Sequence, residues 1–278
     1  GFTDIVALLL AAGADVEARE RASGTMPLHW AAEGGHPEVA RRLLSAGACL
    51  DPVDEWFALT PLGWASVVDW APAFRDDRVT ASRVLREHGA LPDLFTAVLA
   101  GWEGEAEDLV ASDPALLSRR LGFVAEGMQP LHFAASKGLL SAAAGLHDAG
   151  ADPFAVTFSG LTPLALALRD GRGDVEALLR GRGLAEDLPS AIVTGDLLLA
   201  ETLARKARAS GDLSGGGRYA GLLHYAAGRG EAFAAAVLLR NGADPNARMR
   251  WLSGEIPVVT PPLHRAAWEG NIPMIRLL

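Results

Sequence analysis

A short unit that recurs along the chain constrains the fold most strongly. Its clearest copy spans residues 26–48 and reads MPLHWAAEGGHPEVARRLLSAGA. Related segments begin at Gln129, Thr162, Gly221 and Pro261, with the sequences QPLHFAASKG, TPLALALRDG, GLLHYAAGRG and PPLHRAAWEG. Such repetition predicts an array in which one supersecondary unit is stacked on copies of itself.

The first half of the unit has the pattern of a short amphipathic helix. Pro27 fits the first turn, where its missing N–H would have had no partner within the helix. Leu28, Ala31 and Ala32 follow at a spacing that places them on one face. The glycine pair at 34–35 then ends the helix, because glycine tolerates the left-handed backbone of a C-cap.

The second half predicts another helix, with an inner face formed by Val39, Leu43 and Leu44 and an end at Gly47. Two helices of this length cannot bury their apolar faces by themselves. Neighbouring units must therefore supply the rest of the core.

These features resemble the ankyrin repeat, which has a period of about 33 residues and the signature T-P-L-H-x-A. The box reads PLH at 27–29, 130–132 and 262–264 and LLH at 222–224, and its Thr-Pro start is intact at 60–61 and 162–163. A closing Gly-Ala follows at Gly13, Gly47, Gly89, Gly150 and Gly242. The resemblance implies an all-α fold with short β-turn fingers, that is, an ankyrin-repeat solenoid.

The chain is predicted to be a single array over residues 1–278. Its first and last segments match only part of a unit, so we expect the sequence to be cut within a repeat at both ends. The repeats are predicted at approximately 1–22, 23–56, 57–91, 92–125, 126–158, 159–185, 186–217, 218–257 and 258–278.

A larger pattern is superimposed on the array. The segments GALPDLFTAVLAG and GLAEDLPSAIVTG align without a gap, so that Asp93 matches Asp187 and Gly101 matches Gly195. In both segments the aspartate follows the closing glycine almost at once, so there is no room for a finger between the two units. Two regular units and one fingerless unit therefore form a block that is duplicated. An insertion is also predicted at residues 69–78.

Composition limits the classes of partner. The net charge of -9 argues against nucleic acid or an anionic membrane surface as the target. No apolar run has the length of a membrane span, and the single Cys49 indicates a reducing compartment. We therefore expect a cytoplasmic, monomeric protein whose partner is another protein, with no membrane insertion.

The histidines invite a metal or catalytic interpretation. However, His29, His132, His224 and His264 all occupy the signature box. The resemblance implies that such a histidine bonds to the start of its own helix and to the backbone of the adjacent repeat. The sequence contains no H-E-x-x-H or C-x-x-C motif. We therefore predict no metal ligand, no cofactor and no catalytic residue.

The glycine-rich stretches do not change that prediction. GRGDVE from Gly171 lacks the third glycine of a dinucleotide-binding loop, and SGGGRY from Ser214 lacks the Gly-Lys-Ser/Thr of a phosphate-binding loop. The remaining hypothesis is surface binding.

Partners of ankyrin-like arrays commonly contact the finger tips and the exposed inner-helix positions just before the turn glycine. Here a finger covers 51–59, and an extended loop covers 248–260. The predicted contact residues are Glu33, Glu55, Trp56, Phe57, Lys137, Phe158, Arg169, Asp170, Arg229, Trp251, Trp268 and Glu269. Trp30, Trp64 and Trp102 are instead expected to pack between units.

The resemblance thus favours a protein-binding scaffold that acts through its concave face. Two alternatives stay open. The array could be the targeting arm of a larger enzyme or effector whose catalytic domain lies outside this sequence, or it could be a structural spacer without a dedicated partner.

Overall fold

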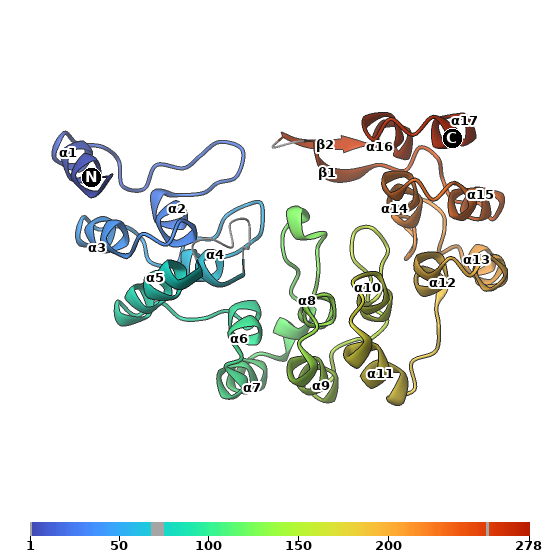
Figure 1. Ribbon diagram of the computed structural model, residues 1–278, viewed down its shortest axis with the longest axis horizontal. Helices are drawn as coiled ribbons and strands as arrows, with labels where there is room; N and C mark the ends of the chain where they lie inside the picture. The colour runs from blue at the N-terminus through green and yellow to red at the C-terminus, as the bar shows by residue number, and fades with distance from the viewer. Residues whose placement is uncertain (1, 68–74, 254–255) are drawn as a thin grey trace. The chain divides into compact units, whose positions relative to one another are not determined.

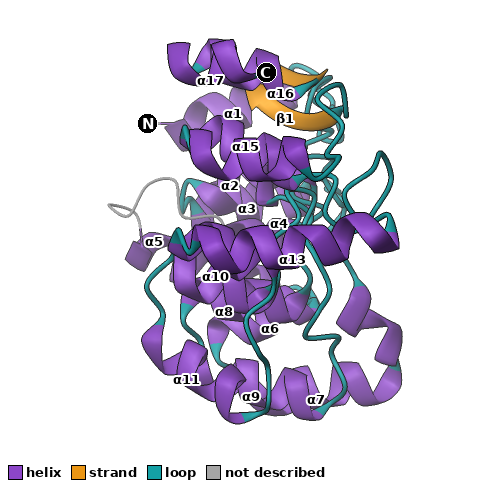
Figure 2. Cartoon of the chain, turned by 90° about the vertical axis from the view of Figure 1, so that its right-hand side faces the viewer, coloured by secondary structure: helices purple, strands orange, loops and turns teal. Residues whose placement is uncertain are grey.

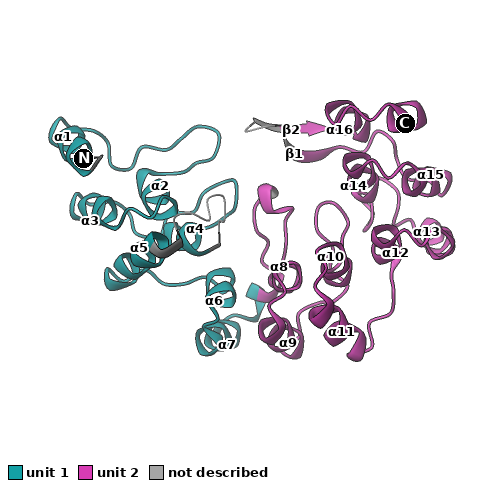
Figure 3. Cartoon of the chain, viewed as in Figure 1, with its two compact units in different colours: residues 1–116 teal, residues 117–278 magenta. Residues whose placement is uncertain are grey.

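The computed structural model describes residues 2–67, 75–253 and 256–278, so most of the insertion predicted at 69–78 lies outside the described residues. The chain divides into two compact units, Gly1–Leu116 and Leu117–Leu278 (Figure 3). The boundary falls within the predicted repeat 92–125. Each unit is built from consecutive pairs of short helices.

The first unit stacks its helices in two rows (Figure 1). Inner helices α2, α4 and α6 contact one another in succession, and outer helices α1, α3 and α5 do the same. The bounds are α1 Phe2–Ala11, α2 Pro27–Glu33, α3 Pro37–Ser45, α4 Pro61–Val67, α5 Arg75–Glu87, α6 Leu94–Ala100 and α7 Glu103–Ser112.

The second unit continues the same plan. Among the inner helices, α8 and α12 both contact α10, and α14 contacts α16. The bounds are α8 Pro130–Lys137, α9 Leu140–Asp148, α10 Pro163–Arg169, α11 Gly173–Gly181, α12 Leu188–Thr194, α13 Leu197–Ser210, α14 Leu222–Arg229, α15 Ala232–Arg240, α16 Pro262–Trp268 and α17 Ile272–Leu277. Two 3₁₀ turns, η2 at Pro114–Ser118 and η3 at Phe123–Ala125, precede α8.

Small side chains form the contacts between stacked helices. Ala32 in α2 and Ala165, Ala191 and Ala226 in the second unit are fully buried. Leucine side chains such as Leu161, Leu166 and Leu222 fill the space around them. Because alanine lets helix backbones approach closely, each pair can bury its apolar face against its neighbours. The all-α solenoid fold class predicted from the sequence is confirmed.

The extended loop expected at residues 248–260 is instead mostly an antiparallel hairpin. Strand β1 (Met249–Ser253) pairs with β2 (Ile256–Thr260), so that Met249 lies opposite Thr260 and Arg250 opposite Val259 (Figure 2). The segment MRWLS before the turn and IPVVT after it are rich in apolar and β-branched side chains, which favour paired strands over an open loop. This hairpin leads directly into α16.

The two segments that lack a finger have the same local structure. The Asp93 side chain accepts a hydrogen bond from Thr96 N at the start of α6, and Asp187 accepts one from Ser190 N at the start of α12. Both helices end at a glycine in the left-handed conformation, Gly101 with φ 71° and Gly195 with φ 75°. An aspartate cap thus starts the helix where the Thr-Pro box is missing.

Replacing Asp187 with alanine is expected to lower the free energy of unfolding by about 1 kcal/mol, the usual cost of removing an N-cap. The carboxylate accepts from both Ser190 N at 2.9 Å and Ser190 Oγ at 2.6 Å. Asp187→Ser keeps an oxygen acceptor and should retain most of the stability in urea titrations. Equal losses in the two variants would show that the cap is not the source of the effect.

Candidate functional site

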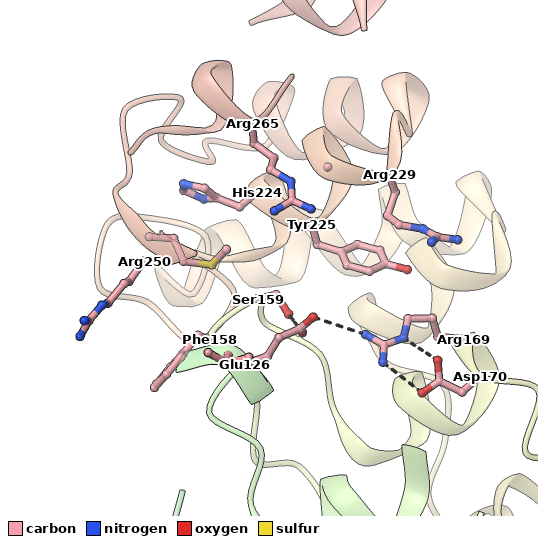
Figure 4. Close-up of a pocket in the computed structure, with 13 residues that line it drawn as sticks. Glu126, Phe158, Ser159, Arg169, Asp170, His224, Tyr225, Arg229, Arg250 and Arg265 are labelled. Carbon is pink, nitrogen blue, oxygen red and sulfur yellow. Dashed lines mark hydrogen bonds and ion pairs between the residues drawn. The ribbon is translucent and has the colours of Figure 1, made fainter. Parts of the chain in front are cut away.

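A cavity of about 450 Å³ opens in the second unit between finger loops and inner helices. Its walls come from segments that are far apart in the sequence: the turn after η3, the loop between α9 and α10, the end of α10, helices α14 and α16, and strand β1 (Figure 4). The lining residues are Val124, Glu126, Phe158, Ser159, Arg169, Asp170, His224, Tyr225, Gly228, Arg229, Met249, Arg250 and Arg265.

An ion-pair network forms one wall of the cavity (Figure 4). The Arg169 guanidinium donates from Nε to Asp170 Oδ1 at 2.8 Å and from Nη2 to Asp170 Oδ2 at 3.0 Å. Its Nη1 lies 3.8 Å from Glu126 Oε1. Ser136 Oγ donates to Asp170, and Ser159 Oγ donates to Glu126 at 2.6 Å. Both carboxylates are therefore held by Arg169 and a serine.

The pKa shifts of Arg169 and Asp170 both favour the ionised form of the side chain. Burial lowers the pKa of Arg169, but the bond to Asp170 and the Glu126 charge outweigh it, so the pKa is raised. Burial likewise raises the pKa of Asp170, but the bonds from Arg169 and Ser136 outweigh it, so the pKa is lowered. Arg169 is thus a fixed cation with its fork already occupied.

Tyr225 and Arg229 lie across the cavity from that network, on α14 (Figure 4). Burial raises the pKa of the Tyr225 hydroxyl, which therefore stays protonated near neutral pH. Arg229 is exposed at the last position of α14. Within the described part of the chain, it has neither a hydrogen bond nor an ion pair through its guanidinium.

Phe158 supplies a fixed aromatic surface at the edge of the cavity. Its ring lies against Gly127, where a Cβ would come within 2.5 Å of the ring, so only glycine fits beneath it. The Arg120 guanidinium lies 5.7 Å from the ring centroid. Phe158 N also donates to Glu126 O at 2.8 Å, which ties the two finger loops together. The side chain nevertheless remains 43% exposed.

The box histidines bond to their own helix start and to the next finger. His29 Nδ1 accepts from Met26 N at 3.1 Å and its Nε2 donates to Leu59 O at 3.3 Å. His132 does the same with Gln129 N at 3.4 Å and Ala155 O at 2.9 Å. Each ring is therefore neutral, with its proton on Nε2.

His224 and His264 depart from this arrangement. His224 Nε2 donates to Thr260 O at 2.9 Å, but its buried Nδ1 has no hydrogen-bond partner among the described residues. The cause is Gly221, which has helical backbone angles where Met26 and Gln129 are extended, so its N–H does not reach the ring. His264 is exposed on α16.

The finger at 51–59 places only some of its predicted contact residues at the surface. Glu55 is exposed, and Trp56 is partly exposed while its Nε1 donates to Ala22 O at 3.0 Å. Phe57 is only 8% exposed and packs edge-on against Trp64, with ring centroids 5.4 Å apart. The expectation that Phe57 is offered to a partner is wrong, because the turn directs it into the core.

The expectation for the other tryptophans also needs one correction. Trp64 is buried and Trp102 packs under the Arg86 guanidinium, which lies 4.6 Å from its ring centroid. Trp30, however, is 48% exposed, although it contacts Trp64 edge-on. It is therefore a surface aromatic of the first unit.

The other predicted contact residues do not converge on one place. Glu33 is half-buried at the end of α2, and Lys137 is exposed at the end of α8. Trp268 and Glu269 are exposed at the end of α16. Trp251 lies in β1 opposite Val258, and its side chain is outside what the structure describes.

Four predicted contact residues do meet in the cavity of the second unit, namely Phe158, Arg169, Asp170 and Arg229. Sequence reasoning missed Glu126, Tyr225, Arg250 and Arg265. Tyr225 and Arg265 each follow a box histidine, so that position carried a signal that could have identified both. Glu126 lies in a turn and Arg250 in strand β1, and the position of both segments depends on the fold.

Neither a metal-binding cluster nor a membrane-spanning helix is found among the described residues. Over residues 2–67, 75–253 and 256–278, no group of three or more His, Cys, Asp or Glu side chains is placed to hold a metal ion. None of the described helices is both long and apolar enough to cross a membrane.

Comparison with known proteins places both ends of the chain in one family. A family model for ankyrin repeats (3 copies) matches residues 1–70, and one for ankyrin repeats (many copies) matches residues 223–278. No curated protein matches the sequence.

Among solved structures, the chain is similar to one described as the Bd0816 predatory endopeptidase from Bdellovibrio bacteriovorus in complex with immunity protein Bd3460. The identity is 22%, and the match covers 63% of this chain and 90% of that chain with a TM-score of 0.43, too low to bear on function. The two family matches, the recurring box and the stacked helix pairs together show that this chain belongs to the ankyrin repeat family.

Proposed function

We propose that this chain is a protein-interaction scaffold, and that its second unit binds a partner protein at the cavity between α10, α14 and α16. Ankyrin repeats are in general protein–protein interaction modules. The observation that carries the proposal is the convergence of Phe158, Arg169 and Arg229 with Tyr225 on one cavity. Tyrosine and arginine are the side chains that most often dominate the energy of protein interfaces.

The rigidity of the site supports a binding role. Arg169 is held by two carboxylates, and Phe158 is held against Gly127. Side chains fixed before binding lose little conformational entropy when a partner arrives, so more of the contact energy appears as affinity. The volume also lies within the range of about 300–1,000 Å³ that is typical of ligand pockets.

The polar groups of the cavity favour binding over catalysis. A nucleophile needs a base within hydrogen-bond reach. Here the Ser159 hydroxyl donates to Glu126, and the His224 Nε2–H donates to the Thr260 carbonyl. The hydroxyl is thus not bonded to the imidazole, and the carboxylate that accepts from it is already ion-paired with Arg169. We therefore propose that the site recognises a surface and does not act on it.

Site-specific photo-crosslinking in the source organism tests the proposal. With p-benzoylphenylalanine in place of Phe158, we expect a crosslinked partner protein, because the ring stands at the edge of the cavity. Phe233 on the outer helix α15 is the matched control, since it is 77% exposed and does not line the cavity. The same substitution there should not capture that partner. Capture at Phe233 but not at Phe158 would contradict the proposed binding face.

A further inference from the structure

We propose that the cavity of the second unit recognises an acidic side chain, an aspartate or glutamate, presented by the partner protein. This inference rests on the proposed function and specifies the chemistry of the contact. The juxtaposition that carries it is an excess of guanidinium groups around a cavity that also presents the Tyr225 ring.

The charges of the lining do not balance. Four arginines line the cavity, Arg169, Arg229, Arg250 and Arg265, against two carboxylates, Glu126 and Asp170. Asp170 is hydrogen-bonded to Arg169, and Glu126 forms an ion pair with it. Arg169 is therefore the arginine that engages both of the lining carboxylates.

Arg229 is best placed to receive a carboxylate. Arg265 has Glu269 beside it, with Nε 3.1 Å from Oε1. Arg229 has no ion pair within the described part of the chain, and its exposed guanidinium stands at the end of α14 next to Tyr225 (Figure 4). A guanidinium presents a planar fork that matches the two oxygens of a carboxylate.

The neighbouring Tyr225 suits the rest of such a side chain. Its ring lines the cavity beside Arg229 and offers an apolar wall for methylene groups, while its protonated hydroxyl can donate to a carboxylate oxygen. A glutamate or aspartate carboxylate beside the ring would replace its hydrogen bonds to water with bonds from the Arg229 guanidinium and the Tyr225 hydroxyl. A lysine or arginine would instead meet the excess of guanidinium groups.

The net charge of the whole chain has the opposite sign, -9. Salt, however, screens exposed charges beyond about 8 Å at physiological ionic strength. Distant carboxylates therefore contribute little at the cavity, and the local arginines decide which side chain is accepted.

Selection from a displayed library of random peptides on the full chain tests this inference. Peptides that use the cavity are identified by loss of binding to the Tyr225→Ala variant but not to the Phe233→Ala variant. We expect these peptides to share an aspartate or glutamate. A synthetic copy with that residue changed to glutamine or asparagine should bind about tenfold more weakly or worse, the size of a moderate interface contact.

A charge exchange then locates the contact. Arg229→Glu should weaken the acidic peptide by about tenfold or more and restore binding to a copy in which the acidic residue is lysine. Arg276→Glu makes the same charge change on α17 outside the cavity and should alter neither affinity. Restored binding would not arise from a merely structural effect of Arg229.

The possible failures are distinguishable. Peptides that need Tyr225 yet bind equally well without their acidic residue, or that depend on a basic one, would overturn the acidic contact and leave the proposed function standing. If no selected peptide depends on the cavity and photo-crosslinking at Phe158 captures nothing, both the proposed function and this inference are wrong.

Discussion

Replacing Asp54 with alanine is expected to lower the free energy of unfolding by about 3 to 5 kcal/mol, because four donors lose a charged acceptor at once. Asp54 Oδ1 accepts from Trp56 N and Phe57 N, both at 2.7 Å. Its Oδ2 accepts from Leu59 N at 3.0 Å and from Trp64 Nε1 at 2.8 Å. The carboxylate is buried, so water cannot replace it in the intact fold.

The position of these donors explains why the loss should spread beyond the finger. Asp54 fixes the turn that directs Phe57 inward, and it fixes the Trp64 indole on which Phe57, His29 and Trp30 pack edge-on. Asp54 N also donates to Leu59 O at 3.1 Å, which closes the base of the finger. One side chain thus joins the finger at 51–59 to helices α2 and α4.

The measurement is urea unfolding followed by circular dichroism, with Asp152→Ala as the matched control. Asp152 is also a finger aspartate, but it is exposed and accepts from Phe154 N at 2.9 Å. Its loss should cost about 1 kcal/mol or less, as expected for an accessible hydrogen bond. Similar losses in the two variants would show that burial and the number of donors do not set the cost.

Lowering the pH from about 6.5 to about 4 is expected to destabilise the second unit through His132, by up to about 3 kcal/mol. Burial lowers the pKa of His132 from its ordinary value of 6.5 to about 4. The ring also accepts a bond at Nδ1 from Gln129 N, so protonation there would set two N–H groups against each other. Burial also lowers the pKa of His29 and of His224.

The sign follows from proton uptake. Between its folded and unfolded pKa values, His132 binds more protons in the unfolded chain than in the folded chain, so stability rises with pH. Its contribution is fully present above about pH 6.5. It is lost as the pH falls towards the folded pKa of about 4. Paired carboxylates such as Asp170 have lowered pKa values, so they lose their contribution only at more acidic pH.

Urea titrations at several pH values between about 7 and about 4 measure this effect. His132→Gln should be less stable than the wild type at neutral pH but should lose less stability on acidification. His36→Gln, which removes an exposed imidazole at the start of α3, is the matched control. Parallel curves for the wild type and His132→Gln would contradict the prediction.

The amino-acid sequence determined the local structure and the family. Helix starts and ends were predictable because they depend on neighbouring residues: proline in the first turn, an aspartate cap at Asp93 and Asp187, and a left-handed glycine at Gly101 and Gly195. The signature box with its histidine predicted the helix pair and the resemblance to ankyrin repeats for the same reason.

Burial and the composition of the cavity were decided only by the tertiary structure. The sequence placed Phe57 at a finger tip, but the bonds of Asp54 turn it onto Trp64. Glu126 meets Arg169 across two repeats, and the hairpin brings Arg250 to the same cavity. Such contacts join segments whose separation in sequence carries no periodic signal. They form because stacking fixes the distance between repeats, a property of the packed array and not of any one unit.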